Sequence, residues 1–285
     1  MSGGRGSLNG VPVLVTGASS GIGRALAVAL AERGARLAIA ARRRARLEEL
    51  ADEIAASGGT RPHVVEADLA RPGAAADVAR SALDTLGTLG VLVNNAGAGL
   101  VGPVGRLGDR DEARTLFELN LWTPIALTQR LLPVLQAERG LVVNVTSSLQ
   151  AVPVPMLGYY GASKLALAHL TRTLRYELRG TGVSVLEVVP GATDTDTRDI
   201  DRLPWRNGPM RTPPPVSAES AARAITKAIE RRRRRRVHPP TSLLPLELPI
   251  IGRLLAALVT RRVDTGTAIG ALNPAAEPYR PEGHS

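Results

Sequence analysis

Short apolar runs alternate with longer, helix-like segments along the first 240 residues of the chain. Runs of Val, Leu, Ile and Ala are typical of buried strands, and apolar residues that recur every three or four positions indicate helices between them. The predicted strands are residues 12–16, 36–41, 64–69, 91–93, 141–145, 183–189 and 237–238. Such alternation predicts an α/β fold, a doubly wound parallel sheet of about seven strands with helices on both faces.

Proline and glycine divide the chain into segments. Residues 1–9 are rich in Gly and Ser without an apolar core, which predicts a flexible tail and not a signal peptide. Residues 10–240 are predicted to form one catalytic domain, in which the proline-rich stretch 192–216 is interpreted as a substrate lid. Residues 241–285 form an extension with one amphipathic helix and a disordered end from Asn273.

The first strand runs directly into a glycine-rich turn, Gly17-Ala-Ser-Ser-Gly21-Ile-Gly23, and a helix begins at Arg24. Strand, glycine turn and helix are the context of a dinucleotide site, where glycines let the backbone approach a pyrophosphate at a helix N-terminus. We therefore predict a Rossmann fold that binds a nicotinamide dinucleotide. The spacing G-x-x-x-G-x-G is itself informative, because it differs from the commoner G-x-G-x-x-G.

The same residues also match G-x-S-x-G, the nucleophile turn of α/β-hydrolases, centred on Ser19. In that fold several strands precede the nucleophile, whereas only one strand precedes Ser19. The histidines lack any triad context; they are His63, His169, His238 and His284. The hydrolase interpretation is therefore disfavoured.

The end of the second strand bears on the choice of cofactor. An NAD site calls for Asp or Glu about 20 residues past the glycines, but no acid occurs between Glu32 and Glu48. Ala41 leaves space there, and Arg42 offers a planar fork of donors to a 2′-phosphate. We predict NADP(H), with NAD(H) less favoured. Asp68, at the end of the third strand, is placed to approach the adenine.

The fourth strand ends in Asn94-Asn95-Ala96-Gly97. In a doubly wound sheet this strand lies beside the first at the switch point where the crevice forms. Buried amides need partners, so Asn94 is predicted to lock the ends of the first and fourth strands together. Gly97 is predicted to allow close approach of the cofactor. A long helix over residues 109–135 follows and carries Asn120, either as a solvated surface residue or as the holder of an active-site water.

A tyrosine and a lysine one helical turn apart follow the fifth strand, at Tyr160 and Lys164. Only two of the 36 basic residues are lysines, so a lysine stands here where the composition favours arginine. An ammonium one turn from a phenol lowers the pKa of the phenol from about 10 toward the range of proton transfer. Ser147, at the end of the fifth strand, completes a candidate catalytic set.

Together these motifs resemble the short-chain dehydrogenase/reductase family over residues 10–195. The residues that carry the resemblance are Thr16 to Gly23, Asp68, Asn94 to Gly97, Asn120, Ser147, Tyr160 with Lys164, and Pro190-Gly191 with Thr195. The resemblance implies that Tyr160 is the proton donor and acceptor, that Ser147 bonds the substrate oxygen, and that Lys164 lowers the pKa of Tyr160 and holds the nicotinamide ribose. It also implies that Asn120 supports a relay water and that Thr193 and Thr195 contact the carboxamide or a phosphate.

The complete set of predicted site residues follows from the motifs and the resemblance. The catalytic residues are Asn120, Ser147, Tyr160 and Lys164. The cofactor-binding residues are Gly17, Ser19, Ser20, Gly21, Ile22, Gly23, Arg42, Asp68, Leu69, Asn94, Ala96, Gly97, Tyr160, Lys164, Pro190, Gly191, Thr193 and Thr195. The substrate pocket is predicted from Ser147, Gln150, Met156, Tyr160 and Trp205, and no metal is expected.

The predicted activity is hydride transfer between NADP(H) and a carbonyl or secondary alcohol of a hydrophobic small molecule. A nucleotide-binding sensor or scaffold without turnover is the alternative. The intact proton-transfer residues disfavour it.

The net charge of +10 must also be explained. Six consecutive arginines, 231–236, lack interleaved aromatics, so nucleic-acid binding is not expected. Apolar residues at helical spacing follow at Leu248, Ile251, Leu255 and Leu258. This stripe is predicted to pack on the fold, with dimerisation and then contact of residues 231–262 with an anionic membrane as the second and third possibilities. The absence of cysteine agrees with a cytoplasmic protein, and a homodimer or homotetramer is expected.

Overall fold

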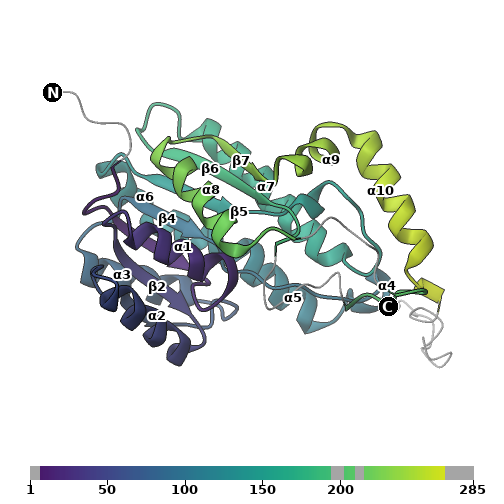
Figure 1. Ribbon diagram of the computed structural model, residues 1–285, viewed down its shortest axis with the longest axis horizontal. Coiled ribbons are helices and arrows are strands. Elements are labelled where there is room, and N and C mark those ends of the chain that lie inside the picture. The colour runs from purple at the N-terminus through teal and green to yellow at the C-terminus, as the bar shows by residue number, and fades with distance from the viewer. Residues whose placement is uncertain (1–6, 194–201, 209–214, 267–285) are drawn as a thin grey trace, which may run out of the picture.

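A computed structural model describes residues 7–193, 202–208 and 215–266 of the chain. Its centre is a parallel sheet of seven strands in the order β3-β2-β1-β4-β5-β6-β7 (Figure 1). The strands are β1 Pro12–Thr16, β2 Arg36–Ala41, β3 His63–Glu66, β4 Val91–Asn94, β5 Leu141–Val145, β6 Ser184–Pro190 and β7 Arg235–His238. The order reverses between β1 and β4, so the predicted doubly wound Rossmann-type fold is confirmed.

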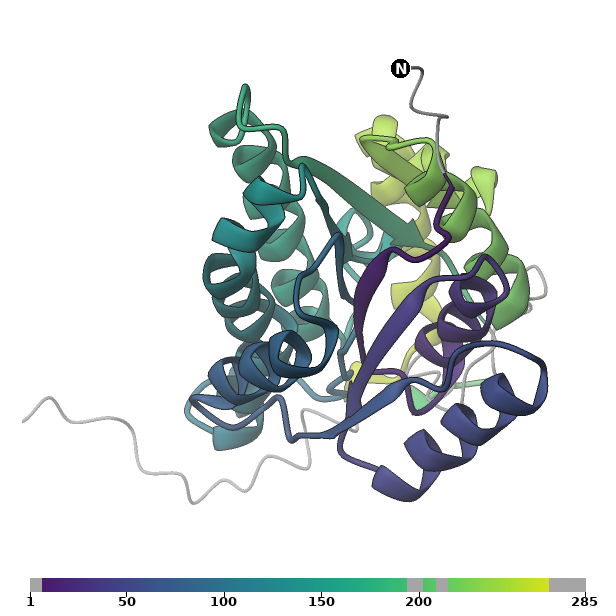
Figure 2. The ribbon, with the colours of Figure 1, turned by 90° about the vertical axis from the view of Figure 1, so that its left-hand side faces the viewer.

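Helices cover both faces of the sheet, as Figure 2 shows. On one face lie α1 Gly21–Ala31, α2 Arg44–Ala56 and α8 Ala218–Glu230. On the other lie α3 Ala74–Leu86, α6 Thr123–Ala137 and α7 Gly158–Glu177. Neighbouring residues of a strand point to opposite faces. Accordingly, Val13 and Val15 of β1 join the first core cluster, whereas Leu14 joins the second.

We predicted one continuous helix over residues 109–135, and this prediction is wrong because the segment is interrupted. After the short α4 Val104–Leu107, the chain forms α5 Asp111–Phe117, a π-helical turn η1 Glu118–Trp122, and then α6. A π-turn accommodates an extra residue and re-aims the side chains within it. Here it contains Asn120, whose side chain is fully buried.

The C-terminal extension also differs from its prediction. Instead of one helix, the 3₁₀ turn η4 Pro240–Ser242 leads into α9 Leu243–Glu247, and α10 Pro249–Arg262 follows at 101° to that segment. Leu248 between the two is extended, and Pro249 has no N–H to continue α9. Among the described helices none is by itself long and apolar enough to cross a membrane, and the bent pair passes such a test only as two pieces together.

Two predicted segment ends shift. Leu8 is buried against the first core cluster and Gly10 donates to the carbonyl of Gly34, so the tail predicted over residues 1–9 is too long. Arg235 and Arg236 belong to β7, so only the earlier part of the arginine run follows the helix end. The predicted disordered end from Asn273 and most of the predicted lid lie outside the described residues.

Candidate active site

The glycine turn after β1 is built for close contact. Gly17 has φ +70°, and a Cβ on it would stand 2.7 Å from the Cα of Ala96. A Cβ on Gly23 would stand 2.3 Å from the carbonyl oxygen of Gly17. The N-cap of α1, Ser20, makes no side-chain capping bond, so its hydroxyl leaves the N–H groups of the first turn uncovered. A cradle of glycine backbone at such a helix N-terminus fits the pyrophosphate of a dinucleotide.

Arg43 is the cation that touches this turn. Its guanidinium donates to the hydroxyl oxygens of Ser19, at 3.0 and 3.2 Å, and of Ser20, at 2.7 Å. We predicted Arg42 for this role, and its part stays a prediction. The sequence signal was the run of three arginines, 42–44, directly after β2. The second of them, Arg43, is the one that turns back toward the glycine turn. Within the part of the chain that the structure describes, Ser19 bonds the guanidinium of Arg43 and no histidine, so the hydrolase interpretation lacks its nucleophile–base pair there.

The two consecutive asparagines at the end of β4 have hydrogen-bond partners that differ from our prediction. Asn95, not Asn94, ties β4 to β1: its amide donates to the carbonyls of Thr16 at 3.0 Å and Gly17 at 3.3 Å. The amide of Asn94 donates to the side-chain oxygen of Asn144 in β5, at 2.8 Å, and lies fully inside. The two side chains therefore bond on opposite sides of β4, Asn94 toward β5 and Asn95 toward β1.

Asn120 closes the wall of the crevice from the other side. It donates to the carbonyl of Ala98 at 2.9 Å and to the hydroxyl of Ser163 at 3.0 Å, and its oxygen accepts from the N–H of Ala98. The hydroxyl of Ser163 donates in turn to the carbonyl of Tyr160. The surface position that we left open for Asn120 is wrong. Its amide fixes the loop after β4 to the first turns of α7.

Lys164 is buried and points at the end of β5. Its ammonium donates to the carbonyl of Val145 at 3.0 Å, and burial lowers its pKa to about 8. A Cβ on Gly97 would stand 3.0 Å from the Lys164 nitrogen and 3.1 Å from the Asn120 oxygen. Gly97, Asn120 and Lys164 therefore meet at one point of the carboxyl edge of the sheet.

Ser147 and Tyr160 are carried by adjoining elements. Ser147 begins the 3₁₀ turn η2 Ser148–Gln150 directly after β5, and its buried hydroxyl accepts from the N–H of Leu149. Tyr160 lies in the first turn of α7, half-buried, one turn before Lys164. The two elements touch, because a Cβ on Gly161 would stand 3.3 Å from the carbonyl of Leu149. The structure thus brings the turn of Ser147 against the helix of Tyr160 and Lys164.

A buried acid supports the predicted substrate wall. Glu187 of β6 is 1% exposed, pairs with Arg172 at 3.3 Å and with Arg235 at 3.7 Å, and accepts from the amide of Gln150 at 3.3 Å. We did not predict Glu187. The only signal in the sequence was a lone carboxylate within an apolar strand, which demands a cationic partner.

The remaining predicted residues lie near the same edge. Met156 and Trp205 pack together with α10 in a third apolar cluster. Gly191 and Thr193 follow β6, where the N–H of Gly191 donates to the carbonyl of His238. Asp68 accepts from the N–H of Ala70 within its own loop. Thr195 lies outside the described residues. The structure places the others as follows: Ile22 in α1, Leu69 buried beside Thr123, Ala96 against Thr16, and Pro190 at the end of β6.

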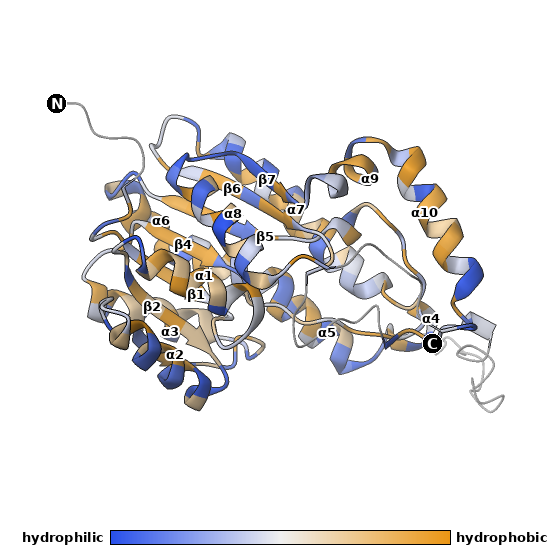
Figure 3. Cartoon of the chain, in the orientation of Figure 1, coloured by the Kyte–Doolittle hydropathy of each residue, from blue (hydrophilic) through white to orange (hydrophobic). Residues whose placement is uncertain are grey.

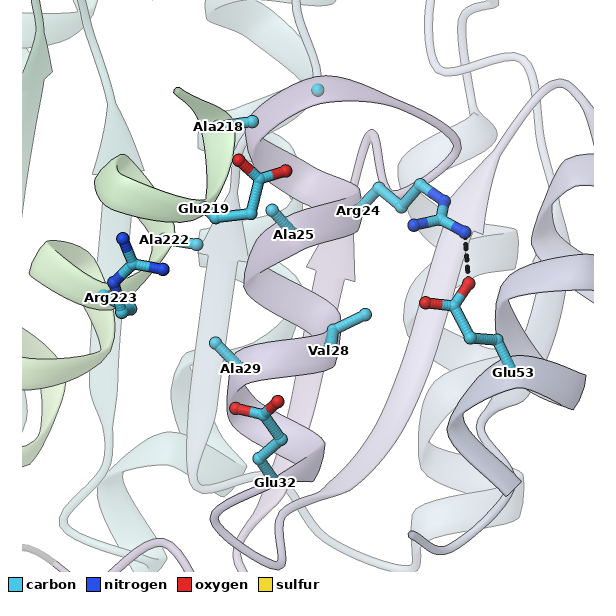
Figure 4. A pocket seen from close by; sticks show the side chains of 11 residues that line it. Arg24, Ala25, Val28, Ala29, Glu32, Glu53, Ala218, Glu219, Ala222 and Arg223 are labelled. Carbon is cyan, nitrogen blue, oxygen red and sulfur yellow. Dashed lines mark hydrogen bonds and ion pairs between the residues drawn. The ribbon is translucent and has the colours of Figure 1, made fainter. Parts of the chain in front are cut away.

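A separate open groove of about 680 Å³ runs between α1, α2 and α8 (Figure 4). Its charged lining residues are Arg24, Glu32, Glu53, Glu219 and Arg223, and Arg24 pairs with Glu53. None of the predicted catalytic residues lines it. Gly21 of the glycine turn also lines the groove, but three carboxylates against two guanidiniums oppose binding of an anionic cofactor, so this groove is not the candidate active site.

Fold and site together define a class. A doubly wound parallel sheet carries a glycine cradle after β1, and Ser147, Tyr160, Lys164 and Asn120 gather at its carboxyl edge. These are features of dinucleotide-dependent oxidoreductases.

Comparison with known proteins agrees. The model of the short chain dehydrogenase family matches residues 12–203. The chain is 34% identical over 229 residues to 11-beta-hydroxysteroid dehydrogenase A of Sesamum indicum, a match that covers 77% of this chain and 65% of that protein. It is 37% identical over 194 residues to dehydrogenase/reductase SDR family member 7B of Mus musculus, covering 66% of this chain and 59% of the relative. The matched part of the chain therefore spans less than two thirds of the length of these two relatives.

Solved structures give the same picture. A short chain dehydrogenase/reductase from Burkholderia phymatum in complex with NAD superposes with a TM-score of 0.76 at 25% identity, covering 87% of this chain and 96% of that one. A short-chain dehydrogenase from Sphingobium yanoikuyae in complex with NADPH has a TM-score of 0.70 at 28% identity, covering 94% and 98%. The chain belongs to the short-chain dehydrogenase family, a family of oxidoreductases.

Proposed function

We propose that the protein is an NADP(H)-dependent oxidoreductase that interconverts a ketone or aldehyde and the corresponding alcohol on a hydrophobic small molecule. The observation that carries the proposal is the meeting of Lys164, Asn120 and Gly97 beside the helix turn of Tyr160, at the edge that also holds the glycine cradle. A protein that only sensed a nucleotide would have no use for a buried lysine one turn from a tyrosine.

Each side chain has a separate task in this mechanism. Bound NADP(H) supplies or accepts the hydride. The hydroxyls of Ser147 and Tyr160 donate hydrogen bonds to the substrate oxygen, and Tyr160 gives up its proton in the reductive direction. With a pKa of about 8, Lys164 stays largely protonated at neutral pH, and its ammonium stabilises the phenolate that remains. Asn120 holds the loop after β4 in register with α7.

The preference for NADP(H) over NAD(H) rests on charge at the glycine turn. No carboxylate follows β2 to accept ribose hydroxyls, whereas Arg42 and Arg43 do follow it, and Arg43 already contacts Ser19 and Ser20. A guanidinium fork matches a phosphate with two parallel hydrogen bonds. Relatives of known structure hold either NADP or NAD, so the choice belongs to this chain's own residues.

An apolar substrate is supported by the third cluster, in which Leu149, Met156 and Trp205 pack beside Val154 and Leu157. Three of the relatives bear the name hydroxysteroid dehydrogenase, and a hydroxysteroid is an alcohol on an apolar skeleton, which agrees with this wall. We propose a ketone or secondary alcohol on a largely apolar skeleton as the substrate class.

The test is turnover of Tyr160→Phe against a panel of apolar ketones and alcohols. We expect the rate to fall by about a thousandfold, because general acid–base catalysis is lost, while NADPH binding measured by fluorescence is retained. The adjacent phenol provides the matched control. Tyr159→Phe should leave the rate within about twofold, since Tyr159 bonds the carbonyl of Val104 away from Lys164. Equal rates for Tyr160→Phe and the wild type would overturn the proposal.

A cytoplasmic location and a homodimer or homotetramer remain part of the proposal. In support of an assembly, Trp122 of η1 and Leu165 of the adjoining α7 are exposed apolar side chains. Such side chains are common at contacts between subunits. Light scattering after size-exclusion chromatography measures the assembly directly.

A further inference from the structure

The helix α10 buries its small residues and exposes its large ones. Toward the body of the protein it turns Gly252, Ala256 and Val259. A Cβ on Gly252 would stand 2.5 Å from the carbonyl of Ala151, so only glycine permits this approach. The stripe that we predicted to pack on the fold does so only at Ile251, which is half-buried, whereas Leu248, Leu255 and Leu258 are exposed. The bend at Leu248 and the close approach of Gly252 decide which face meets the body.

The outward side of α10 carries a row of exposed apolar side chains. Ile250 is 61% exposed, Leu254 63% and Leu258 46%, and at helical spacing they lie on one side. Leu243 and Leu244 of the preceding α9 are exposed as well, and Figure 3 shows hydrophobic residues along both helices. We define the outer face as Leu243, Leu244, Leu248, Ile250, Leu254, Leu255 and Leu258. In water such a cluster requires an occupant.

Charge selects among the occupants. No acidic residue occurs between Glu247 and Asp264, whereas Arg253 flanks the outer face and Arg261 and Arg262 end the helix. A second copy brought face to face would oppose arginine with arginine. The face also lacks the aromatics that protein interfaces favour. Leucines bordered by arginines match the acyl and headgroup layers of an anionic bilayer.

We propose that α9 and α10 form a peripheral docking surface for an anionic lipid membrane, with the outer face inserted among the acyl chains. With 14 residues α10 is about 21 Å long, shorter than the hydrocarbon core of about 30 Å, so it lies along the interface and does not cross it. Helices surrounded by lipid pack small residues against the protein and turn leucines toward the lipid, and α10 has this arrangement.

The surface is firmly joined to the enzyme. Glu247 of α9 pairs with Arg235 of β7, which also pairs with the buried Glu187. At the other end of α10, the N–H of Arg206 donates to the carbonyl of Arg262 at 2.9 Å, and the N–H of Asp264 donates to the carbonyl of Pro204 at 2.7 Å. The docking helix is thereby tied to the segment that carries Trp205.

Flotation of the full-length protein with lipid vesicles tests the proposal. We expect binding to vesicles of phosphatidylcholine mixed with phosphatidylserine, and a loss of about a hundredfold in the variant Ile250→Ser, Leu254→Ser, Leu258→Ser. Tyr176→Ser is the matched control, because Tyr176 is 63% exposed on α7 and its variant should bind as the wild type does. Cofactor-dependent turnover of a water-soluble ketone verifies that each variant is folded.

A second arm separates charge from insertion. Replacing Arg253, Arg261 and Arg262 by Gln should weaken binding to the mixed vesicles by about fivefold per residue. Binding that survives the serine substitutions would mean that the net charge of +10 acts without insertion, and would overturn the proposal. The proposal would also be overturned if the serine variant lost a dimer in light scattering while its vesicle binding was unchanged. Vesicle binding that arose only after removal of residues 267–285 would overturn it as well.

Discussion

The glycine cradle and the helix α10 both depend on small residues, but for different purposes. In the cradle, Gly17 and Gly23 let backbone segments approach one another and leave donors facing outward for a ligand. In α10, Gly252 and Ala256 let the helix approach the body and leave leucines facing outward. The comparison teaches that a glycine reports only a close approach. What the approach serves is decided by the groups left exposed on the other side.

The cofactor edge can be perturbed most strongly through its buried ammonium. The pKa of Lys164 is lowered from 10.5 to about 8, so the unfolded chain binds more protons than the native protein between those pH values. Stability of the cofactor-free protein should therefore rise with pH in this window, by about 3 kcal/mol from this group. Urea unfolding of the wild type and of Lys164→Met at pH 8 and pH 10.5 measures the difference. From pH 8 to pH 10.5 the free energy of unfolding of the wild type should rise by that amount relative to the variant. A difference that stays constant would contradict the lowered pKa of Lys164.

A pair of glycine substitutions sharpens the comparison directly. Gly23→Ala forces a Cβ to 2.3 Å from a carbonyl of the cradle, and Gly252→Ala forces one to 2.5 Å from the carbonyl of Ala151. Each should lower the free energy of unfolding by about 2 kcal/mol, the cost of overpacking. Only Gly23→Ala should also weaken NADPH binding, measured by titration of cofactor fluorescence. Equal loss of NADPH affinity in both variants would erase the distinction between the regions.

The smallest expected effect distinguishes the arginine at the glycine turn, Arg43, from the arginines of α10, which are proposed to bind lipid. Arg43→Ala removes the guanidinium that contacts Ser19 and Ser20, and should weaken NADPH binding by about tenfold, the value of one charge-assisted contact. Binding of NADH, which has no 2′-phosphate, should change little, and vesicle binding should not change. An equal loss for NADPH and NADH would assign Arg43 to the shape of the turn and not to the phosphate.

The sheet and the cradle were predictable because their signals are local. Buried parallel strands appear as continuous apolar runs, and the glycine turn from Gly17 to Gly23 follows the first of them at fixed spacing. Tyr160 and Lys164 were found by helical spacing and by the rarity of lysine in this chain. Nothing beyond the neighbouring residues is needed to recognise these features.

The errors arose where distant segments decide the outcome. Asn94 and Asn95 are alike in sequence, and only the contacts made in the folded chain assign one to β5 and the other to β1. The π-turn at Asn120 places its amide against Ala98 and Ser163, which lie elsewhere in the chain. In α10 the leucine spacing was detected correctly, but hydrophobicity alone does not say whether the partner of a face is protein or lipid.

The backbone pairing between residues 204–206 and the end of α10 has a consequence for engineering. Trp205 bridges Val263, so the segment that carries Trp205 and the end of α10 are joined by backbone pairing. Specificity in this scaffold should therefore be transplanted between relatives as a single cassette from Leu203 through Asp264. Shortening the chain to a point before α10 would remove one partner of this pairing and should alter selectivity along with it.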